Sequence, residues 1–545
     1  MGLRIAAVIP ARGGSKGIPR KNMRLMNGRP LIAYAIENAL TCPLIDDVIV
    51  SSDSEEILAF AGQFDGVIPL NRDSALAQDA VTLDPVIYDA VVRTEQELRC
   101  AYDVVVTLQP TSPLLTTETL SAALQQFVES DNDTVISVVN APHLSWKMGP
   151  NGVEPAYEKR LNRQQLPPNY HETGAFLIAR RACMTAQTRI GSKVSVFEVP
   201  EDESVDIDTK QDWVVCEAML GRKLIAFRVD GYKELGLGHI FRALTLAYEF
   251  TEHDVVFLCD KRHRAGIDKL RSSNMHVIEI ADDQELLEWL GANHPDVYAH
   301  DCLDTTVELM KAIKPLVGRL VTFEDLGDGA NIADAVVNAI YEGAPSHGNV
   351  YAGKNYVALR DEFLTSRPKK FSENVERVLV TFGGTDPLDL SSRIYAMASD
   401  YNANGILVEF DFILGSGYTG AVEGSLPERG ISVTRDAIRV SDFMRKADLA
   451  FSSQGRTTFE LAAMGVPTIV LAQNEREQLH RFAQMDNGFI NLGLGSEVSD
   501  EDIRAAFEWM MSAKSVRKEM HRLMLGNDLK SGVKRVKRII LGEML

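Results

Sequence analysis

The sequence predicts an α/β protein built from largely parallel sheets, and three observations support this. Short apolar runs rich in β-branched residues alternate with amphipathic helical stretches along the chain, as in βαβ units. The composition, with 45% hydrophobic and 24% charged residues, is typical of a globular protein. At 545 residues the chain is too long for a single hydrophobic core, so we expect more than one domain.

The expected strands fall into two series, which we assign to two domains. The first series is 5–9, 48–52, 104–108 and 134–139, and the second begins with 224–229, 255–259 and 297–301. The helix expected around 213–220 leads directly into the second series, so we place the domains at 1–221 and 222–545. A polar stretch at 371–376 precedes a strong strand at 377–382. It divides the second domain into two Rossmann-like lobes, 222–370 and 371–545, with a cleft between them.

The charge and the apolar pattern limit the partners and the location. A formal net charge of −19 argues against non-specific binding to nucleic acid or to an anionic membrane. No apolar segment reaches 18 residues, and the first apolar run is too short for a signal peptide. The six cysteines are scattered without metal-binding spacing. We therefore expect a cytoplasmic protein without structural zinc, in which any anionic ligand is held by a local cluster of positive charge.

Such a cluster follows the first expected strand. Residues 10–22 read PARGGSKGIPRKN, in which three glycines are interleaved with Arg12, Lys16, Arg20 and Lys21. Glycines let backbone amides approach an anion, and the cations neutralise it. The loop matches neither the Walker A pattern nor the dinucleotide fingerprint. It predicts a cradle for a triphosphate.

Seven motifs, in order along residues 3–220, resemble the CMP-sialic acid synthetases, or acylneuraminate cytidylyltransferases. They are the loop at 9–22, SSDS at 51–54, RDS at 72–74, LQPTSP at 108–113, RQQ at 163–165, HETGAF at 171–176 and DID at 206–208. Thr173 stands where many members have Asn. The resemblance implies a Rossmann-like nucleotidyltransferase domain of the GT-A type. Its implied reaction joins CTP to a nonulosonic (sialic-type) acid and releases pyrophosphate, and its implied state is a homodimer or larger.

The chemistry of that reaction assigns roles to residue types. A sugar hydroxyl attacks the α-phosphorus of CTP, so the site must neutralise a triphosphate and its leaving group. Arg12, Lys16 and Lys21 suit this task. Asp206 and Asp208 lie two apart on an extended segment and share one face, and their hard oxygens suit Mg²⁺. We expect Arg12, Lys21 and Asp208 to be catalytic and the Asp pair to hold the metal.

The resemblance also implies contacts that the residue types alone do not assign. It places Gly13, Gly14, Ser15, Lys16, Asn22, Ser52 and Arg72 at the nucleotide. It places Gln109, Lys147 and Gln165 at the sugar acid. Which nonulosonic acid is used (sialic, legionaminic, pseudaminic or another) stays open, because one methylene or N-acetyl group changes binding by only about 1–3 kcal/mol.

The second domain opens with a strand, a glycine turn and a helix. The strand at 224–229 is followed by Asp230-Gly231, and Gly236-Leu237-Gly238-His239 then opens an amphipathic helix. This arrangement predicts an anion or sugar site. A histidine at the positive end of a helix dipole is disfavoured as imidazolium, so His239 can act as a general base on water. Further glycine-rich turns follow at 382–387, 414–418 and 452–460.

Residues 224–485 resemble the UDP-sugar hydrolase of pseudaminic acid biosynthesis and its spore-coat-polysaccharide relatives, which share the two-lobed GT-B shape. The resemblance implies that His239 activates water without a metal and that Arg228 and Asp230 line the sugar side. It places Gly384, Thr457, Thr458 and Glu460 at the UDP. Arg456 departs from the small residues usual in this turn and could favour a different phosphate ligand.

Three hypotheses for the second domain remain open. It hydrolyses a UDP-sugar, which makes the protein a bifunctional enzyme of nonulosonic acid biosynthesis. Alternatively it is a glycosyltransferase that uses a CMP- or UDP-sugar donor, or a silent binding or oligomerisation module. The basic stretch from Lys530 to Lys537 predicts a solvated face of a terminal helix.

Overall fold

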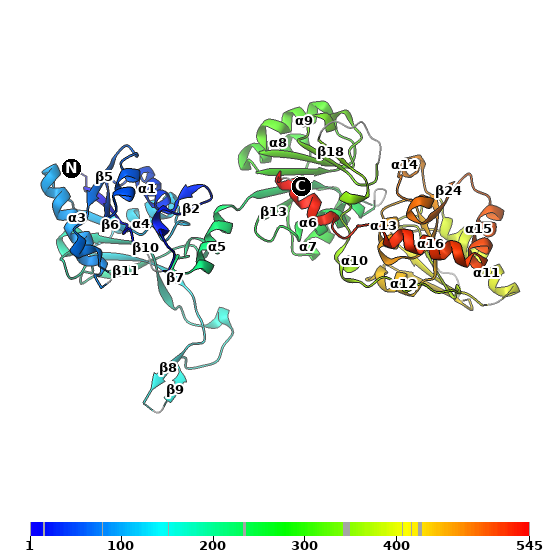
Figure 1. The fold of residues 1–545 in the computed structure, drawn as a ribbon, viewed down its shortest axis with the longest axis horizontal. Coiled ribbons are helices and arrows are strands. Elements are labelled where there is room, and N and C mark those ends of the chain that lie inside the picture. Colours follow the sequence, from blue (N-terminus) through cyan, green and yellow to red (C-terminus); the bar gives the residue numbers. More distant parts are fainter. Residues whose placement is uncertain are drawn as a thin grey trace. The chain divides into compact units, whose positions relative to one another are not determined.

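The computed structural model describes residues 2–14, 17–78, 80–150, 152–232, 236–341, 349–405, 407–415, 417–422 and 428–543. The chain divides into two compact units, Met1–Arg222 and Lys223–Leu545. Both units are α/β in architecture, as Figure 1 shows, so the predicted fold class is confirmed. None of the helices in the described ranges combines the length and the apolar character that crossing a bilayer requires.

The first unit is built on a mixed sheet of seven strands. In spatial order they are β11 (Val194–Glu198), β7 (Thr134–Asn140), β10 (Tyr170–Arg180), β6 (Val104–Leu108), β1 (Ile5–Pro10), β4 (Asp47–Ser52) and β5 (Val67–Asn71). The helices are α1 (Leu31–Thr41), α2 (Glu55–Ala61), α3 (Leu83–Leu98), α4 (Thr117–Glu129) and α5 (Lys210–Leu220). Two short strands, β2 (Leu25–Met26) and β3 (Arg29–Pro30), form a separate ribbon.

Strand β1 shows why this sheet is buried on both faces. Ile5, Ala7 and Ile9 belong to one hydrophobic core, whereas Ala6 and Val8 belong to another. Successive side chains of a strand point to opposite faces, so a continuous apolar run needs cover on both sides. The strand therefore lies in the middle of three layers, with its carboxyl end at the glycine-rich loop.

The expectation of parallel sheets is wrong for one strand of the first unit. β10 pairs antiparallel with both β6 and β7, while the other four strand pairs of this sheet are parallel. Along β10 the register shifts between Glu172 and Leu177. The motif at 171–176 thus lies at an irregularity, which turns Gly174 toward the end of β6.

A two-stranded hairpin departs from the sheet of the first unit. It consists of β8 (Trp146–Gly149) and β9 (Gly152–Pro155), which pair only with each other. Figure 1 shows the hairpin at the end of an arm between β7 and β10, away from the sheet. The side chains of Trp146, Met148 and Val153 are exposed.

The second unit contains two parallel sheets. The first has the order β14 (His276–Ile280), β13 (Asp254–Asp260), β12 (Leu224–Val229), β15 (Val297–Asp301), β16 (Arg319–Phe323), β17 (Ala335–Asn338) and β18 (Val350–Ala352). Its helices are α6 (Gly238–Ala247), α7 (Arg264–Ser272), α8 (Asp283–Asn293) and α9 (Val307–Ile313). The second has the order β21 (Ile431–Arg435), β20 (Glu409–Leu414), β19 (Arg377–Thr381), β22 (Leu449–Ser453), β23 (Thr468–Ala472) and β24 (Phe489–Leu494).

Helices of the second lobe surround its sheet. They are α11 (Leu390–Asn404), α12 (Val440–Lys446), α13 (Thr457–Met464), α14 (Glu475–Gln478), α15 (Asp500–Ser512) and α16 (Lys514–Leu525), and α10 (Asp361–Thr365) lies on the connection between the lobes. In β19, Val378 and Val380 face one core and Leu379 faces another. Each lobe is thus a three-layer unit of its own, as a chain of βαβ elements predicts.

The terminal helix α17 (Gly532–Leu541) corrects the expected extent of the second lobe. Val533, Val536, Ile539 and Ile540 join the core of the first lobe, together with Ile225 and Phe227 of β12. The prediction of 371–545 as one lobe is therefore wrong at its end. The basic residues of Lys530–Lys537 alternate with these apolar ones, so the helix is amphipathic and only one of its faces is solvated.

Candidate functional sites

The glycine-rich loop is tied to the carboxyl end of β4. Ala11 N donates to Ser51 O (3.0 Å), and Gly13 N donates to Asp53 Oδ1 (2.9 Å). The buried Asn22 donates from Nδ2 to Arg12 O (3.0 Å), which holds the two ends of the loop together. Ser15 and Lys16 lie outside the described residues.

Lys21 faces the Asp206–Asp208 segment. Its Nζ donates to Ile207 O (2.6 Å) and lies 4.0 Å from Asp208 Oδ1. Burial lowers the pKa of Lys21, while the carboxylates of Asp208 and Asp206 oppose this and Arg12 adds to it. A Cβ on Gly17 would lie 2.8 Å from Asp208 O, so only glycine lets the loop pass this close. The two expected parts of the site therefore meet.

Asp206 is the buried member of the carboxylate pair. Its Oδ1 atom is buried and, among the described residues, has no hydrogen-bonding partner, whereas the Asp208 side chain is 80% exposed. Burial raises the pKa of Asp206, and the Thr111 hydroxyl and then Lys21 oppose the rise. A buried acceptor without a donor is costly unless a ligand satisfies it.

These two carboxylates fit a magnesium ion that is completed by substrate. In the described part of the chain, no group of three His, Cys, Asp or Glu residues could by itself hold a metal. Mg²⁺, however, usually binds through one or two carboxylates together with waters and substrate phosphates. The unsatisfied Asp206 oxygen and the exposed Asp208 match that requirement.

Arg72 and Ser52 lie at the end of β4, beneath the glycine loop. Both are buried, and Arg72 donates to Ser51 O (2.6 Å) and to Ser51 Oγ (3.2 Å). Burial lowers the pKa of Arg72, Asp53 opposes this and Arg12 adds to it. Arg72 is therefore close to the loop, but its described contacts support the strand end.

Gln109 and Asp206 both lie against Gly174, on the side where its Cβ would be. A Cβ on Gly174 would be 3.1 Å from Asp206 Oδ2 and 3.2 Å from Gln109 Nε2, and its φ of +72° is also one that glycine favours. Gln165 is exposed in the 3-10 helix Arg163–Gln165.

Lys147 does not join this cluster. It lies on β8 of the hairpin, 62% exposed, with its Nζ 3.5 Å from Glu154 Oε1. Figure 1 shows the arm that carries it leaving the sheet. Within a single chain, the structure does not bring Lys147 to the expected sugar site. The order of motifs along the sequence could not predict this, because it gives no information on the direction in which an inserted arm points.

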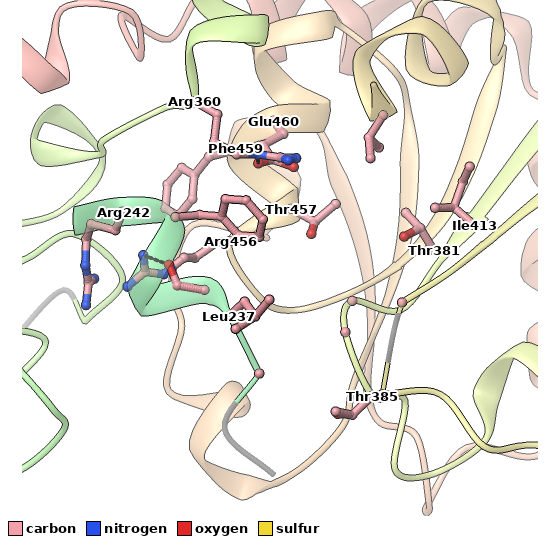
Figure 2. A pocket seen from close by; sticks show the side chains of 18 of the residues that line it. Leu237, Arg242, Arg360, Thr381, Thr385, Ile413, Arg456, Thr457, Phe459 and Glu460 are labelled. Carbon is pink, nitrogen blue, oxygen red and sulfur yellow. Dashed lines mark hydrogen bonds and ion pairs between the residues drawn. The ribbon is translucent and has the colours of Figure 1, made fainter. Parts of the chain in front are cut away.

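The second unit has a cavity of about 940 Å³ between its two lobes. Of the residues predicted to hold UDP, Gly384, Thr457 and Glu460 line the cavity, whereas Thr458 is buried with its Oγ1 donating to Gly455 O (2.7 Å). Figure 2 shows Leu237 and Arg242 of the first lobe on one side and Thr381, Thr385 and Ile413 of the second on the other. The volume of this cavity lies in the range of small-molecule sites.

Two glycine turns meet at one wall of this cavity. Gly417 N donates to Gly384 O (3.0 Å), and a Cβ on Gly415 would lie 2.5 Å from the Gly384 Cα. The turns at 382–387 and 414–418 therefore pack backbone against backbone. Gly383, Gly384, Thr385, Gly415 and Gly417 of these turns line the cavity.

His239 is the second residue of α6 and is bound to Asp301 at the end of β15. The two lie 2.5 Å apart, Nδ1 to Oδ1. Arg242 donates from Nε to Asp301 Oδ2 (2.7 Å) and pairs with Oδ1 as well. Burial by itself raises the pKa of Asp301, but Arg242 and His239 outweigh it and hold that pKa at about 2. The described lining of the cavity includes Gly238 and Arg242, the neighbours of His239, but not the imidazole.

A second carboxylate, Glu324, continues this network. It follows β16 with a φ of +51°, is buried and pairs with Arg242 on one side. On the other side Arg456 of the second lobe donates to Glu324 Oε2 (2.6 Å) and to Gly238 O (3.2 Å). Burial raises the pKa of Glu324 to about 7, against the pull of Arg242.

The sequence analysis did not predict this network, although the spacing of His239 and Arg242 along the chain indicates one part of it. Arg242 is one helical turn from His239, and a basic residue at i+3 from a predicted base is a signal that could have been used. Glu324 and Arg456 are 132 positions apart, and no local pattern relates them.

Arg228 and Asp230 form a buried pair, 2.7 Å from Nη1 to Oδ2, and neither is in the described lining of the cavity. Burial raises the pKa of Asp230, but Arg228 outweighs it and the net pKa is lowered. The structure does not bring them to the wall where Gly384 and Thr457 lie.

Known proteins resemble mainly the first unit. A family model described as Cytidylyltransferase matches residues 6–242. The pseudaminic acid cytidylyltransferase of Campylobacter jejuni is 32% identical over 212 residues, which are 38% of this chain and 91% of the relative. The CMP-N,N'-diacetyllegionaminic acid synthase of Legionella pneumophila is 34% identical over 235 residues, 40% of this chain and 97% of the relative. The N-acylneuraminate cytidylyltransferase B of Danio rerio is 31% identical over 298 residues, 52% of this chain and 67% of the relative.

Two solved structures also match. MurG of Acinetobacter baumannii has a TM-score of 0.45 at 14% identity and covers 59% of this chain and 99% of its own. A CMP:2-keto-3-deoxy-manno-octonic acid synthetase in complex with CTP has a TM-score of 0.30 at 17% identity and covers 40% of this chain and 98% of its own.

Proposed function

The chain belongs to the cytidylyltransferase family, and from this premise we propose that its first unit transfers CMP from CTP to a nonulosonic acid and releases pyrophosphate. The observation that carries the proposal is the meeting of Lys21 with Asp206 and Asp208 under the glycine loop. Three relatives named for pseudaminic, legionaminic and acylneuraminic substrates support the class of acid and leave its identity open.

The residues divide the work as the chemistry requires. Arg12 and Lys21 neutralise the triphosphate and the leaving pyrophosphate, aided by the amide of Gly14, whereas the amide of Gly13 is held by Asp53. Arg72 holds the end of β4 in place beneath them, through Ser51. Gln109, beside Asp206, orients the sugar acid for its attack on the α-phosphorus.

Asp206 and Asp208 would hold a magnesium ion. When bound, the metal supplies charge that offsets the phosphate oxygens during transfer. Lys21 stands next to the same carboxylates and keeps their negative charge balanced when no ligand is present.

Substitution of Asp208 tests the first activity. In the full chain, Asp208→Ala should reduce pyrophosphate release from CTP, Mg²⁺ and a panel of nonulosonic acids by about a thousandfold, because the metal loses a carboxylate. Asp202→Asn, an exposed carboxylate nearby in sequence, serves as the control. Unchanged pyrophosphate release by Asp208→Ala would refute the assignment, and mass spectrometry of the wild-type products identifies the acid.

For the second unit, we propose hydrolysis of a UDP-sugar with His239 as the base. The specific observation is the His239–Asp301 pair directly beside a cavity that glycine turns line. Because a carboxylate only accepts, Nδ1 carries the hydrogen and Nε2 is the nitrogen left to accept a proton from water.

UDP release is the test of this second activity. His239→Ala should abolish it while pyrophosphate release from CTP continues. UDP that appears only when an acceptor sugar is added would instead assign a glycosyltransferase. Binding of UDP without turnover in either case would assign a silent module.

A further inference from the structure

An arginine that lines the cavity of the second unit connects the two lobes. Arg456 is the residue before α13, in the second lobe, and its guanidinium donates to Glu324 Oε2 (2.6 Å) and Gly238 O (3.2 Å) of the first lobe. Figure 2 shows Arg456 between Arg242 and Thr457, with its side chain on the side of α6. Arg456, Glu324 and Gly238 all line the cavity.

Glu324 forms an ion pair with Arg242 that does not depend on Arg456. Its other oxygen pairs with Arg242, which also holds Asp301. Glu324 is buried, whereas the Arg456 side chain is 28% exposed. Of the two ends of this ion pair, the arginine is therefore the one that can move without leaving a buried charge unpaired.

A phosphate group in the cavity would compete with Glu324 for that arginine. Guanidinium binds phosphate through two parallel hydrogen bonds, and a phosphate carries more charge than a carboxylate. The lining of the same cavity includes Thr457, which follows Arg456 in the chain, and the joined turns of Gly384 and Gly417. Backbone amides and an arginine together are the usual partners of a nucleotide diphosphate.

We propose that Arg456 exchanges partners when the second unit binds its ligand: it leaves Glu324 and pairs with a phosphate of a nucleoside diphosphate. Glu324 thus acts as a built-in competitor for the nucleotide. The inference rests on the proposed function of the second unit only in that the ligand is a nucleoside diphosphate.

The exchange has a consequence for the first lobe. Once Arg456 has left, Glu324 interacts with Arg242 alone, and Arg242 is the residue that holds Asp301 against His239. Occupation of the nucleotide wall in one lobe therefore changes the charge around the expected base in the other. In this arrangement Arg456 is a ligand-binding residue, and Glu324 is a positioning residue that acts through Arg456 and Arg242.

Calorimetric titration with UDP and with uridine tests the exchange. All proteins are full-length and carry Lys21→Ala, which removes a nucleotide contact in the first unit. Arg456→Ala should weaken UDP binding about 30-fold or more and leave uridine binding within about twofold, since only the phosphate contact is lost. Glu324→Gln should tighten UDP binding about three- to tenfold, because the competing charge is gone while the amide oxygen still accepts from Arg242.

A second pair between the lobes provides the matched control. Asp304 and Arg476 lie 2.8 Å apart, Oδ1 to Nη2, and neither lines the cavity in the described residues. Asp304→Asn loosens the lobes in the same way as Glu324→Gln but frees no residue of the cavity, so its UDP affinity should stay within about twofold of the parent. Arg456→Lys should lie between the parent and Arg456→Ala.

The outcomes separate this inference from the proposed hydrolase. Unchanged or weaker UDP binding by Glu324→Gln overturns the exchange, as does an equal loss of uridine binding by Arg456→Ala, or no UDP binding by the parent. If these results accompany His239-dependent UDP release, the hydrolase stands and the exchange fails. If the affinities move as expected but no UDP-sugar is cleaved, the exchange stands and the hydrolase fails.

Discussion

The Nδ1 atom of His239 lies 2.5 Å from Oδ1 of Asp301, and this contact determines which imidazole nitrogen can act on water. Asp301 accepts and cannot donate, because Arg242 and His239 hold its pKa at about 2 against burial. The hydrogen therefore stays on Nδ1, and Nε2 carries the free electron pair.

Replacement of Asp301 by asparagine should remove this control of the tautomer. The amide can donate to Nδ1, which leaves the hydrogen on Nε2, where it blocks proton abstraction. We expect UDP release to fall by roughly two to four orders of magnitude. Pyrophosphate release from CTP, measured on the same preparation, should be unaffected. Full UDP release by Asp301→Asn would show that the pair has no catalytic role.

Gly174→Ala should damage the first site through geometry alone. The new Cβ would sit 3.1 Å from Asp206 Oδ2 and 3.2 Å from Gln109 Nε2, at a φ of +72°. We expect kcat/KM for pyrophosphate release to fall at least about tenfold, because a small displacement of aligned groups is costly. Gly152→Ala is the control, since Gly152 has a φ of +112° with open space around it on the hairpin. Both variants carry backbone strain, so an equal loss of activity in both would argue against the site.

His300 should make the second unit sensitive to acid. Burial, aided by Arg228, lowers its pKa from 6.5 to about 3, so the folded state keeps it neutral while the unfolded state protonates near pH 6.5. Stability is then complete above pH 6.5 and is lost as the pH falls from 6.5 toward 3, by up to about 1.4 kcal/mol per pH unit.

The variant His300→Asn isolates this contribution. The amide keeps a partner for the Tyr298 hydroxyl, which lies 3.0 Å from His300 Nδ1. Between pH 6.5 and 5, its free energy of unfolding in urea should fall by about 2 kcal/mol less than that of the wild type. Packing costs affect both pH values equally, so parallel curves for the two proteins would contradict the prediction.

Ile540→Ala should weaken the first lobe of the second unit although the residue lies at the end of the chain. Ile540 is fully buried in the core shared with β12, so the cavity left behind should cost about 2–5 kcal/mol in the free energy of unfolding. Lys534→Ala, on the exposed face of the same helix, should change it by less than about 0.5 kcal/mol. Equal urea midpoints for the two variants would mean that α17 is not part of the core.

Strand positions could be predicted because buried parallel strands carry their signal locally. The expected strands at 104–108, 224–229 and 297–301 agree with β6, β12 and β15 residue for residue. The direction of β10 could not be predicted in this way, since an apolar run has the same composition in either direction. The glycine-rich loop and the Asp206–Asp208 pair could be predicted for a related reason, because each lies within one short sequence motif.

Contacts between residues far apart in the chain could not be predicted from the sequence. The pairing of Glu324 with Arg456 depends on where two lobes meet, and the position of Lys147 depends on where an arm points. The packing of α17 on the first lobe could not be predicted either, because its apolar face could have packed on either lobe. In each case the energy that decides the outcome comes from residues far away in the chain.

The polypeptide passes between the two lobes of the second unit twice, once before β19 and once before α17. Because two chain segments connect the lobes, one lobe can rotate about the line through both connections more readily than about any other axis. No single cut would yield either lobe with its interior complete, so a fragment that ends near residue 525 would expose the apolar surface of β12 and its neighbours to water. Fragments meant to separate the two units should therefore be divided before β12, at the junction of the units.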